Sequence, residues 1–194
     1  MRRALPILIG LAVAAALGIG LSQAGVDEAP RAERAERFDL VAAREQLAGS
    51  PAPLAALHEQ SAALLDGGTE AFAARLAALK GRPVVVNKWA SWCGPCRAEF
   101  PVFQRLSTRL GNQVAFLGLN SGDNREDAAA FLREYPVPFP SYVDPAEKIA
   151  RSIGAAANYP ITVFYGRDGR RAFVHQGQYR TEADLAADIA RYAR

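Results

Sequence analysis

The sequence predicts an α/β domain in which a central mixed β-sheet is flanked by helices. Val84-Val85-Val86 is a short β-branched run, typical of a strand that is buried on both faces. Residues 161–165 and 171–175 are strand-like, and Asp168-Gly169 between them predicts a hairpin of two antiparallel strands. Amphipathic segments with helix caps lie between and after these runs, so helices and strands alternate along the chain.

The first 24 residues indicate export. Arg2 and Arg3 precede an uncharged stretch over residues 4–21, and Ser22-Gln23-Ala24-Gly25 follows as a small-residue site, which is the order of parts in a signal peptide. The uncharged stretch also approaches the roughly 20 residues of a transmembrane helix, so a cleaved signal peptide and a retained N-terminal membrane anchor stay open as alternatives. The positive-inside rule places the rest of the chain on the extracytoplasmic side.

Residues 25–68 are expected to form a helical linker or extension. Residues 26–37 are Ala-rich with mixed charges, which favours a solvated spacer. Two helices are expected at 39–47 and 54–65, because the Gly, Ser and Pro residues at 49–53 end one helix and begin the next.

The predicted domain occupies residues 69–194. It is expected to begin with a helix capped by Thr69 and ended by Gly81, followed by the strand at 84–86 and a helix from the cysteines to residue 110 with Gly111 as its stop. A strand at 114–119 and a helix capped by Asp123 or Asn124 that ends by Tyr135 come next. The chain then continues with a helix opened by Asp144, Pro145 and Glu147 and ended by Gly154, the hairpin, and a last helix capped by Thr181.

Composition excludes several classes of function. The net charge is +3 and no long basic block is present, so nucleic acid is not expected as a partner. The chain has only 2 cysteines, which excludes a multi-disulfide scaffold and a cluster with four thiolate ligands. No metal ion and no cofactor are expected.

Cys93 and Cys96 carry the predicted chemistry. Gly94 and Pro95 separate them on the first turn of a helix, so both sulfurs lie on one side at a separation that a disulfide can bridge. Cys93 stands at the helix N-terminus, where the helix dipole stabilises a thiolate, and is the expected nucleophile. Cys96 is the expected resolving thiol, and the dipeptide between them tunes the redox potential.

Three other uses of the cysteine pair are disfavoured. A zinc site needs two more ligands, and the only histidines, His58 and His175, lack zinc-site spacing. A haem attachment site needs histidine at position 97, which is arginine. A static disulfide across so short a loop adds little stability.

The segment Trp89-Ala90-Ser91-Trp92-Cys93-Gly94-Pro95-Cys96 resembles the active site of thioredoxins, and Pro101 matches the proline within their first catalytic helix. Tyr159-Pro160 resembles the cis-proline loop of that family. The resemblance covers residues 71–194 and implies a thioredoxin-like fold, a cis bond before Pro160, and substrate binding by Trp92, Tyr159 and Pro160.

The run Cys96-Arg97-Ala98-Glu99-Phe100-Pro101 resembles the exported TlpA/ResA-like branch of the thioredoxin superfamily, and residues 121–144 resemble its insertion between strand and helix. This resemblance implies an extracytoplasmic protein disulfide reductase of the cell envelope. Its partners would be oxidised protein thiols, apocytochrome c among them, a membrane thiol-disulfide electron donor, and the membrane itself through the N-terminal segment. The alternatives are an oxidase that donates its disulfide to secreted proteins and a binding module without turnover.

Two further residues are singled out. By resemblance Glu99 manages protons when Cys96 reacts, with an exposed glutamate as the alternative. Lys88 stands where the family usually has a large apolar residue, so its ammonium must reach water or pair with an acid, and it either lowers a thiol pKa or is simply accommodated.

Overall fold

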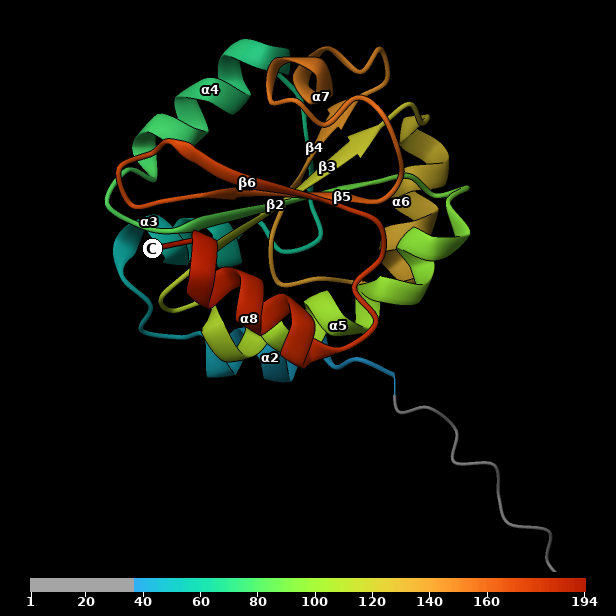
Figure 1. The fold of residues 1–194 in the computed structure, drawn as a ribbon. Coiled ribbons are helices and arrows are strands. Elements are labelled where there is room, and N and C mark those ends of the chain that lie inside the picture. The colour runs from blue at the N-terminus through green and yellow to red at the C-terminus, as the bar shows by residue number, and fades with distance from the viewer. Residues whose placement is uncertain (1–36) are drawn as a thin grey trace, which may run out of the picture. The chain divides into compact units, whose positions relative to one another are not determined.

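A six-stranded mixed sheet runs through the molecule in the order β1-β4-β3-β2-β5-β6 (Figure 1). Its strands are β1 (Leu64–Leu65), β2 (Val84–Trp89), β3 (Ala115–Ser121), β4 (Ser141–Asp144), β5 (Ile161–Tyr165) and β6 (Arg171–Gln176). The central strand β2 pairs parallel with β3 and antiparallel with β5. The predicted mixed sheet and the antiparallel hairpin of β5 and β6 are thereby confirmed.

The structure is a computed structural model that describes residues 37–194, of which Phe38–Arg194 form one compact unit. The predictions for residues 1–24, and for the spacer up to residue 36, lie outside the described residues. Within residues 37–194 no helix combines the length and the apolar character needed to span a membrane.

Helices cover both faces of the sheet. They are α2 (Leu40–Gln46), α3 (Ala52–His58), α4 (Gly68–Ala78), α5 (Gly94–Leu110), α6 (Arg125–Glu134), α7 (Lys148–Ser152) and α8 (Glu182–Tyr192). Figure 1 shows α4 and α7 on one side of the sheet and α5 and α8 on the other. Successive side chains of a strand point to opposite faces, so Val85 and Trp89 of β2 pack with α5, whereas Val84 and Val86 pack with α4.

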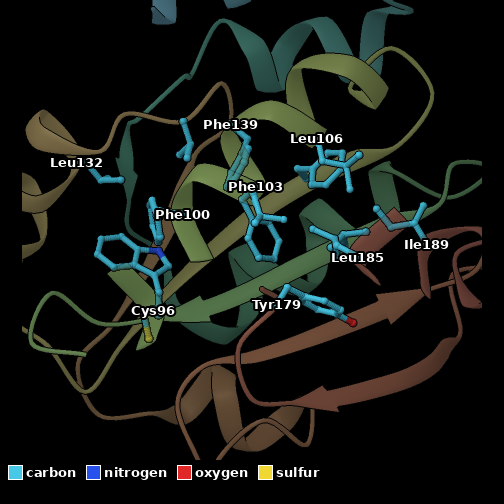
Figure 2. Close-up of a cluster of buried hydrophobic side chains, with 14 of the residues drawn as sticks. Cys96, Phe100, Phe103, Leu106, Leu132, Phe139, Tyr179, Leu185 and Ile189 are labelled. Atoms are coloured by element: carbon cyan, nitrogen blue, oxygen red, sulfur yellow. The ribbon is translucent and has the colours of Figure 1, made fainter. Parts of the chain in front are cut away.

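The larger apolar core lies between the sheet and α5. Figure 2 shows Phe100, Phe103 and Leu106 of α5 beside Leu185 and Ile189 of α8, all buried. Burying a side chain of this size contributes about 1.5–3 kcal/mol. Because α5 carries the cysteines at its start, this packing holds the helix N-terminus in place.

Local signals predicted several boundaries correctly. Helix α5 ends at Leu110, β5 spans Ile161–Tyr165, and the side chains of Asn124 and Thr181 cap α6 and α8.

Two predicted helix boundaries are wrong, and one strand was missed. The helix expected at 54–65 ends at His58, and Leu64–Leu65 instead forms β1, an edge strand that pairs parallel with β4. Strand β4 was not predicted, because its four residues follow a proline-rich turn and pair only with distant segments. Helix α4 is capped by Gly67, which has a φ of 108°, and not by Thr69.

The segment at Asp144 also differs from the prediction. Asp144 is the last residue of β4, and α7 begins only at Lys148. Its carboxylate nevertheless accepts hydrogen bonds from the backbone N–H groups of Ile149 and Ala150, at 3.0 and 2.8 Å, so it still caps the helix from a strand position.

Gly111 ends α5 for a reason that the sequence did not reveal. Its φ is −64°, so it does not adopt the left-handed conformation of a helix-stopping glycine. A Cβ at this position would lie 2.5 Å from the carbonyl oxygen of Ser107 and 2.9 Å from Cδ2 of Leu47. Close packing of the segment after α2 against α5 therefore requires glycine here.

Candidate active site

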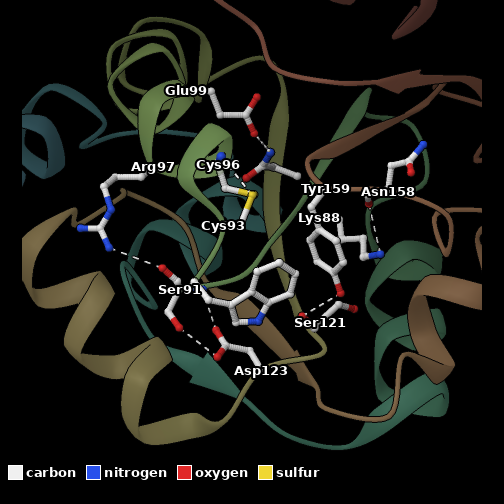
Figure 3. The surroundings of a disulfide bond; sticks show 12 residues. Lys88, Ser91, Cys93, Cys96, Arg97, Glu99, Ser121, Asp123, Asn158 and Tyr159 are labelled. Atoms are coloured by element: carbon white, nitrogen blue, oxygen red, sulfur yellow. Dashed lines mark hydrogen bonds between the residues drawn. A yellow bond between two sulfur atoms is a disulfide. The ribbon is translucent and has the colours of Figure 1, made fainter.

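The cysteine pair lies where β2 leads into α5 (Figure 3). Cys93 is the N-cap of α5 and forms a disulfide with Cys96, with their Cα atoms 5.2 Å apart. The backbone N–H of Cys96 donates a hydrogen bond to Sγ of Cys93 at 3.1 Å. Cys93 keeps 4% of its surface exposed and Cys96 none, so a substrate reaches the sulfur of Cys93 first. A donor aimed at that sulfur from the helix N-terminus favours its thiolate form.

Glu99 lies one helical turn after Cys96 and is fully buried. Its Oε1 accepts a hydrogen bond from the side-chain amide of Asn87 at 2.7 Å, and its Oε2 accepts one from the backbone N–H of Tyr179 at 3.1 Å. Burial raises the pKa of Glu99 to about 8, against the lowering effect of these two donors. The alternative of a solvent-exposed glutamate is therefore wrong.

Two aromatic side chains stand beside the disulfide. Trp92 is 60% exposed, and its ring centroid lies 4.8 Å from that of Tyr159 in an edge-to-face arrangement. The indole N–H of Trp92 donates to the carbonyl of Gly122 at 3.0 Å. The bond between Tyr159 and Pro160 is cis, as the sequence predicted. The structure thus brings Trp92 and the Tyr159-Pro160 loop together near the cysteines.

Asp123 is a site residue that sequence reasoning assigned only to helix capping. Its carboxylate accepts hydrogen bonds from the backbone N–H and the hydroxyl of Ser91, at 2.7 and 2.9 Å, and from the amide of Asn120 at 2.8 Å. These bonds tie the loop before Cys93 to the end of β3. No local pattern reveals this role, because Ser91 and Asp123 meet only when β2 and β3 pair.

Lys88 has an acidic partner, as one of its two expected environments required. Its side chain is fully buried, and Nζ lies 3.5 Å from Oε1 of Glu147 and 3.4 Å from the carbonyl oxygen of Asn158. Burial lowers the pKa of Lys88, and the Glu147 carboxylate opposes that shift. Sequence reasoning placed Glu147 in a helix turn and missed this ion pair.

A family model places this site in a known group of proteins. The model for redoxins matches residues 47–189, which is more than half of the chain. The chain belongs to the redoxin family.

In sequence, this redoxin is similar to proteins named as thiol:disulfide interchange proteins and thiol-disulfide oxidoreductases. It is 32% identical over 135 residues to the thiol:disulfide interchange protein DsbE of Escherichia coli, covering 70% of this chain and 63% of that one. It is 28% identical over 93 residues to the thiol-disulfide oxidoreductase ResA of Bacillus thuringiensis, covering 47% and 53%. It therefore spans less than two thirds of the length of either relative.

A solved structure agrees with this assignment. The crystal structure of a thiol:disulfide interchange protein DsbE from Chlorobium tepidum superposes with a TM-score of 0.54 at 28% identity, covering 60% of this redoxin and 83% of that chain. The thioredoxin-like fold and the TlpA/ResA-like resemblance are thus confirmed.

Proposed function

We propose that this redoxin is an extracytoplasmic thiol-disulfide oxidoreductase that reduces disulfides in proteins by exchange at Cys93 and Cys96. One observation carries the proposal: the sulfur of Cys93 stands at the N-terminus of α5 and receives a hydrogen bond from a backbone N–H. The relatives' names, thiol:disulfide interchange protein and thiol-disulfide oxidoreductase, support the same reaction class.

The reaction proceeds in two exchanges. The thiolate of Cys93 attacks one sulfur of a substrate disulfide, forms a mixed disulfide, and releases the other substrate sulfur, which takes up a proton. Cys96 then loses its proton and attacks Sγ of Cys93. The Cys93–Cys96 disulfide forms, the second substrate thiol leaves, and two electrons have passed to the substrate. A dithiol donor in the membrane restores the reduced pair.

Glu99 serves as the group that exchanges a proton with Cys96: its ionised form accepts the proton when Cys96 attacks, and its neutral form, which burial favours, supplies one when the Cys96 thiolate is set free. Its raised pKa of about 8 lies close to the value of about 8.5 for a free cysteine thiol, and proton transfer between groups of matched pKa needs little driving force. The neighbouring Asn87 cannot titrate, so of this hydrogen-bonded pair of side chains Glu99 is the one that can exchange a proton.

Protein substrates bind over Trp92, Tyr159 and Pro160. An extended peptide pairs with the backbone of Tyr159 in the manner of an added strand, while the exposed Trp92 ring supplies apolar contact. Insulin reduction tests the reaction: the dithiol form should turn over insulin disulfides, and the Cys93→Ser variant should not. A wild-type protein that leaves insulin oxidised would contradict the proposal.

The physiological setting we propose is the cell envelope, with the protein either anchored through residues 1–24 or secreted after their cleavage. Apocytochrome c is the proposed substrate, supported by the resemblance of Glu99 and Pro101 to the TlpA/ResA-like pattern. Trapping thiols in cells with a mass-shifting alkylator should find the dithiol, and haem staining of a deletion strain should find less holocytochrome c. A fully oxidised pool with normal cytochromes would favour the oxidase alternative, and a reduced pool with normal cytochromes would leave a general envelope reductase.

A further inference from the structure

The buried ammonium of Lys88 lies against the ring of Tyr159, in the Tyr159-Pro160 loop. Lys88 is on the face of β2 opposite to Glu99, and its Nζ is 3.7 Å from the centroid of the Tyr159 ring. An ammonium over an aromatic face is attracted more strongly when both groups are removed from water, and Lys88 has no exposed surface. The ammonium of Lys88 therefore holds one face of the Tyr159 ring in place.

The hydroxyl end of the same ring is held as well. Tyr159 lies within hydrogen-bonding distance of the carbonyl oxygen of Ser121, at 2.9 Å, and of Oε1 of Glu147. Glu147 in turn is the ion-pair partner of Lys88. The hydrogen bond from Tyr159, with Lys88 adding to it, lowers the pKa of Glu147 and keeps this acceptor charged. Three groups from three separate segments thus fix both the face and the tip of one ring.

The ring of Tyr159 contacts the exposed side chain of Trp92, on which we propose that substrates bind. Trp92 packs against Tyr159 and is tied to Gly122 through its indole N–H. A Cβ on Gly122 would lie 2.7 Å from the Tyr159 hydroxyl, so the loop approaches the ring closely. Figure 3 shows Lys88 and Tyr159 on the side of the disulfide away from Glu99. A change in the position of Tyr159 therefore alters the packing of Trp92, which precedes Cys93 in the chain.

We propose that Lys88 and Glu147 are positioning residues for protein substrates, because they hold Tyr159 against Trp92 and so preform the docking surface beside Cys93. The inference rests on the proposed exchange at Cys93. It assigns Lys88 to the binding of large substrates. The sequence had left open that Lys88 lowers the pKa of a thiol, and the inference does not give it that role. A small disulfide needs only the sulfur of Cys93 and not the aromatic surface.

The test compares a protein substrate with a small one. Insulin and bis(2-hydroxyethyl) disulfide are reduced by the wild type and by Lys88→Met and Glu147→Gln, with dithiothreitol as the electron source. Lys148→Met is the matched control, since it removes an exposed neighbouring lysine. We expect KM for insulin to rise about tenfold in both site variants. The kcat for insulin and the rate with the small disulfide should stay unchanged, and the control should match the wild type.

Fluorescence gives a readout that does not depend on turnover. Acrylamide reaches Trp92, which is exposed, and not Trp89, which is fully buried. Loosening Tyr159 should increase quenching of Trp92 in the reduced Lys88→Met and Glu147→Gln proteins and leave it unchanged in Lys148→Met.

Two results would overturn the proposal. The first is an unchanged KM for insulin together with unchanged quenching. The second is an equal loss with both disulfides and a shifted pH profile of Cys93 alkylation, which would assign Lys88 to the thiol. If Lys88→Met fails to fold, Glu147→Gln decides alone. If the wild type does not reduce insulin, the proposed function fails, and quenching still decides whether the two residues hold the aromatic pair.

Discussion

Glu99→Gln should remove a large pH dependence from the stability of the folded protein. The pKa of Glu99 is raised from 4.5 to about 8 by burial. Between these two values the folded protein holds one proton more than the unfolded chain, so the free energy of unfolding falls as pH rises. The stabilisation that protonated Glu99 provides is complete below pH 4.5 and is lost as pH rises through about 8.

The size of the effect follows from linkage. A proton difference of one changes the free energy of unfolding by about 1.4 kcal/mol per pH unit. From pH 5 to pH 7 the wild type should therefore lose about 3 kcal/mol from this group alone. Glutamine has nearly the same shape and cannot ionise, so the variant should lack that slope while still accepting the hydrogen bond from the N–H of Tyr179.

The assay is urea unfolding at pH 5, 6 and 7, followed by circular dichroism. The oxidised protein is used, because disulfide-bonded Cys93 and Cys96 do not titrate and cannot contribute to the slope. Glu126→Gln, which changes an exposed glutamate of α6, is the matched control and should keep the wild-type slope. Parallel curves for the wild type and Glu99→Gln would refute the reasoning, because they would mean that burial does not hold this carboxyl neutral.

Other substitutions test the rest of the site. Cys93→Ser should abolish disulfide exchange, whereas Cys96→Ser should trap substrate in a mixed disulfide on a non-reducing gel; trapping by Cys93→Ser alone would reverse the two roles. Gly122→Ala should lower the free energy of unfolding by about 1–3 kcal/mol, because φ is +58° and the new methyl meets a tyrosine hydroxyl; an unchanged midpoint in thermal unfolding would contradict this. Asp123→Ala should lower the free energy of unfolding by about 1–3 kcal/mol, because it leaves the N–H of Ser91 without its acceptor, and it should also slow insulin reduction. Wild-type values of both would show that the hydrogen bonds between Asp123 and Ser91 are unimportant.

The cysteine pair and the elements around it could be predicted from the sequence. The β-branched run at 84–86, the Asp-Gly turn and the caps at Asn124 and Thr181 are local signals, since each depends on residues within a few positions of one another. The placement of Cys93 at a helix N-terminus followed from the same local rules. The export segment, by contrast, stays a prediction of the sequence.

The surroundings of the cysteines were decided only by the tertiary structure. Strands β1 and β4 are short, and they exist because distant segments pair with them. Glu99 has a raised pKa because α5 packs it under β2, and the Lys88–Glu147 pair joins residues that β2 and the segment before α7 bring together. Burial and non-local contact are properties of the packed chain, and no window of a few residues contains them.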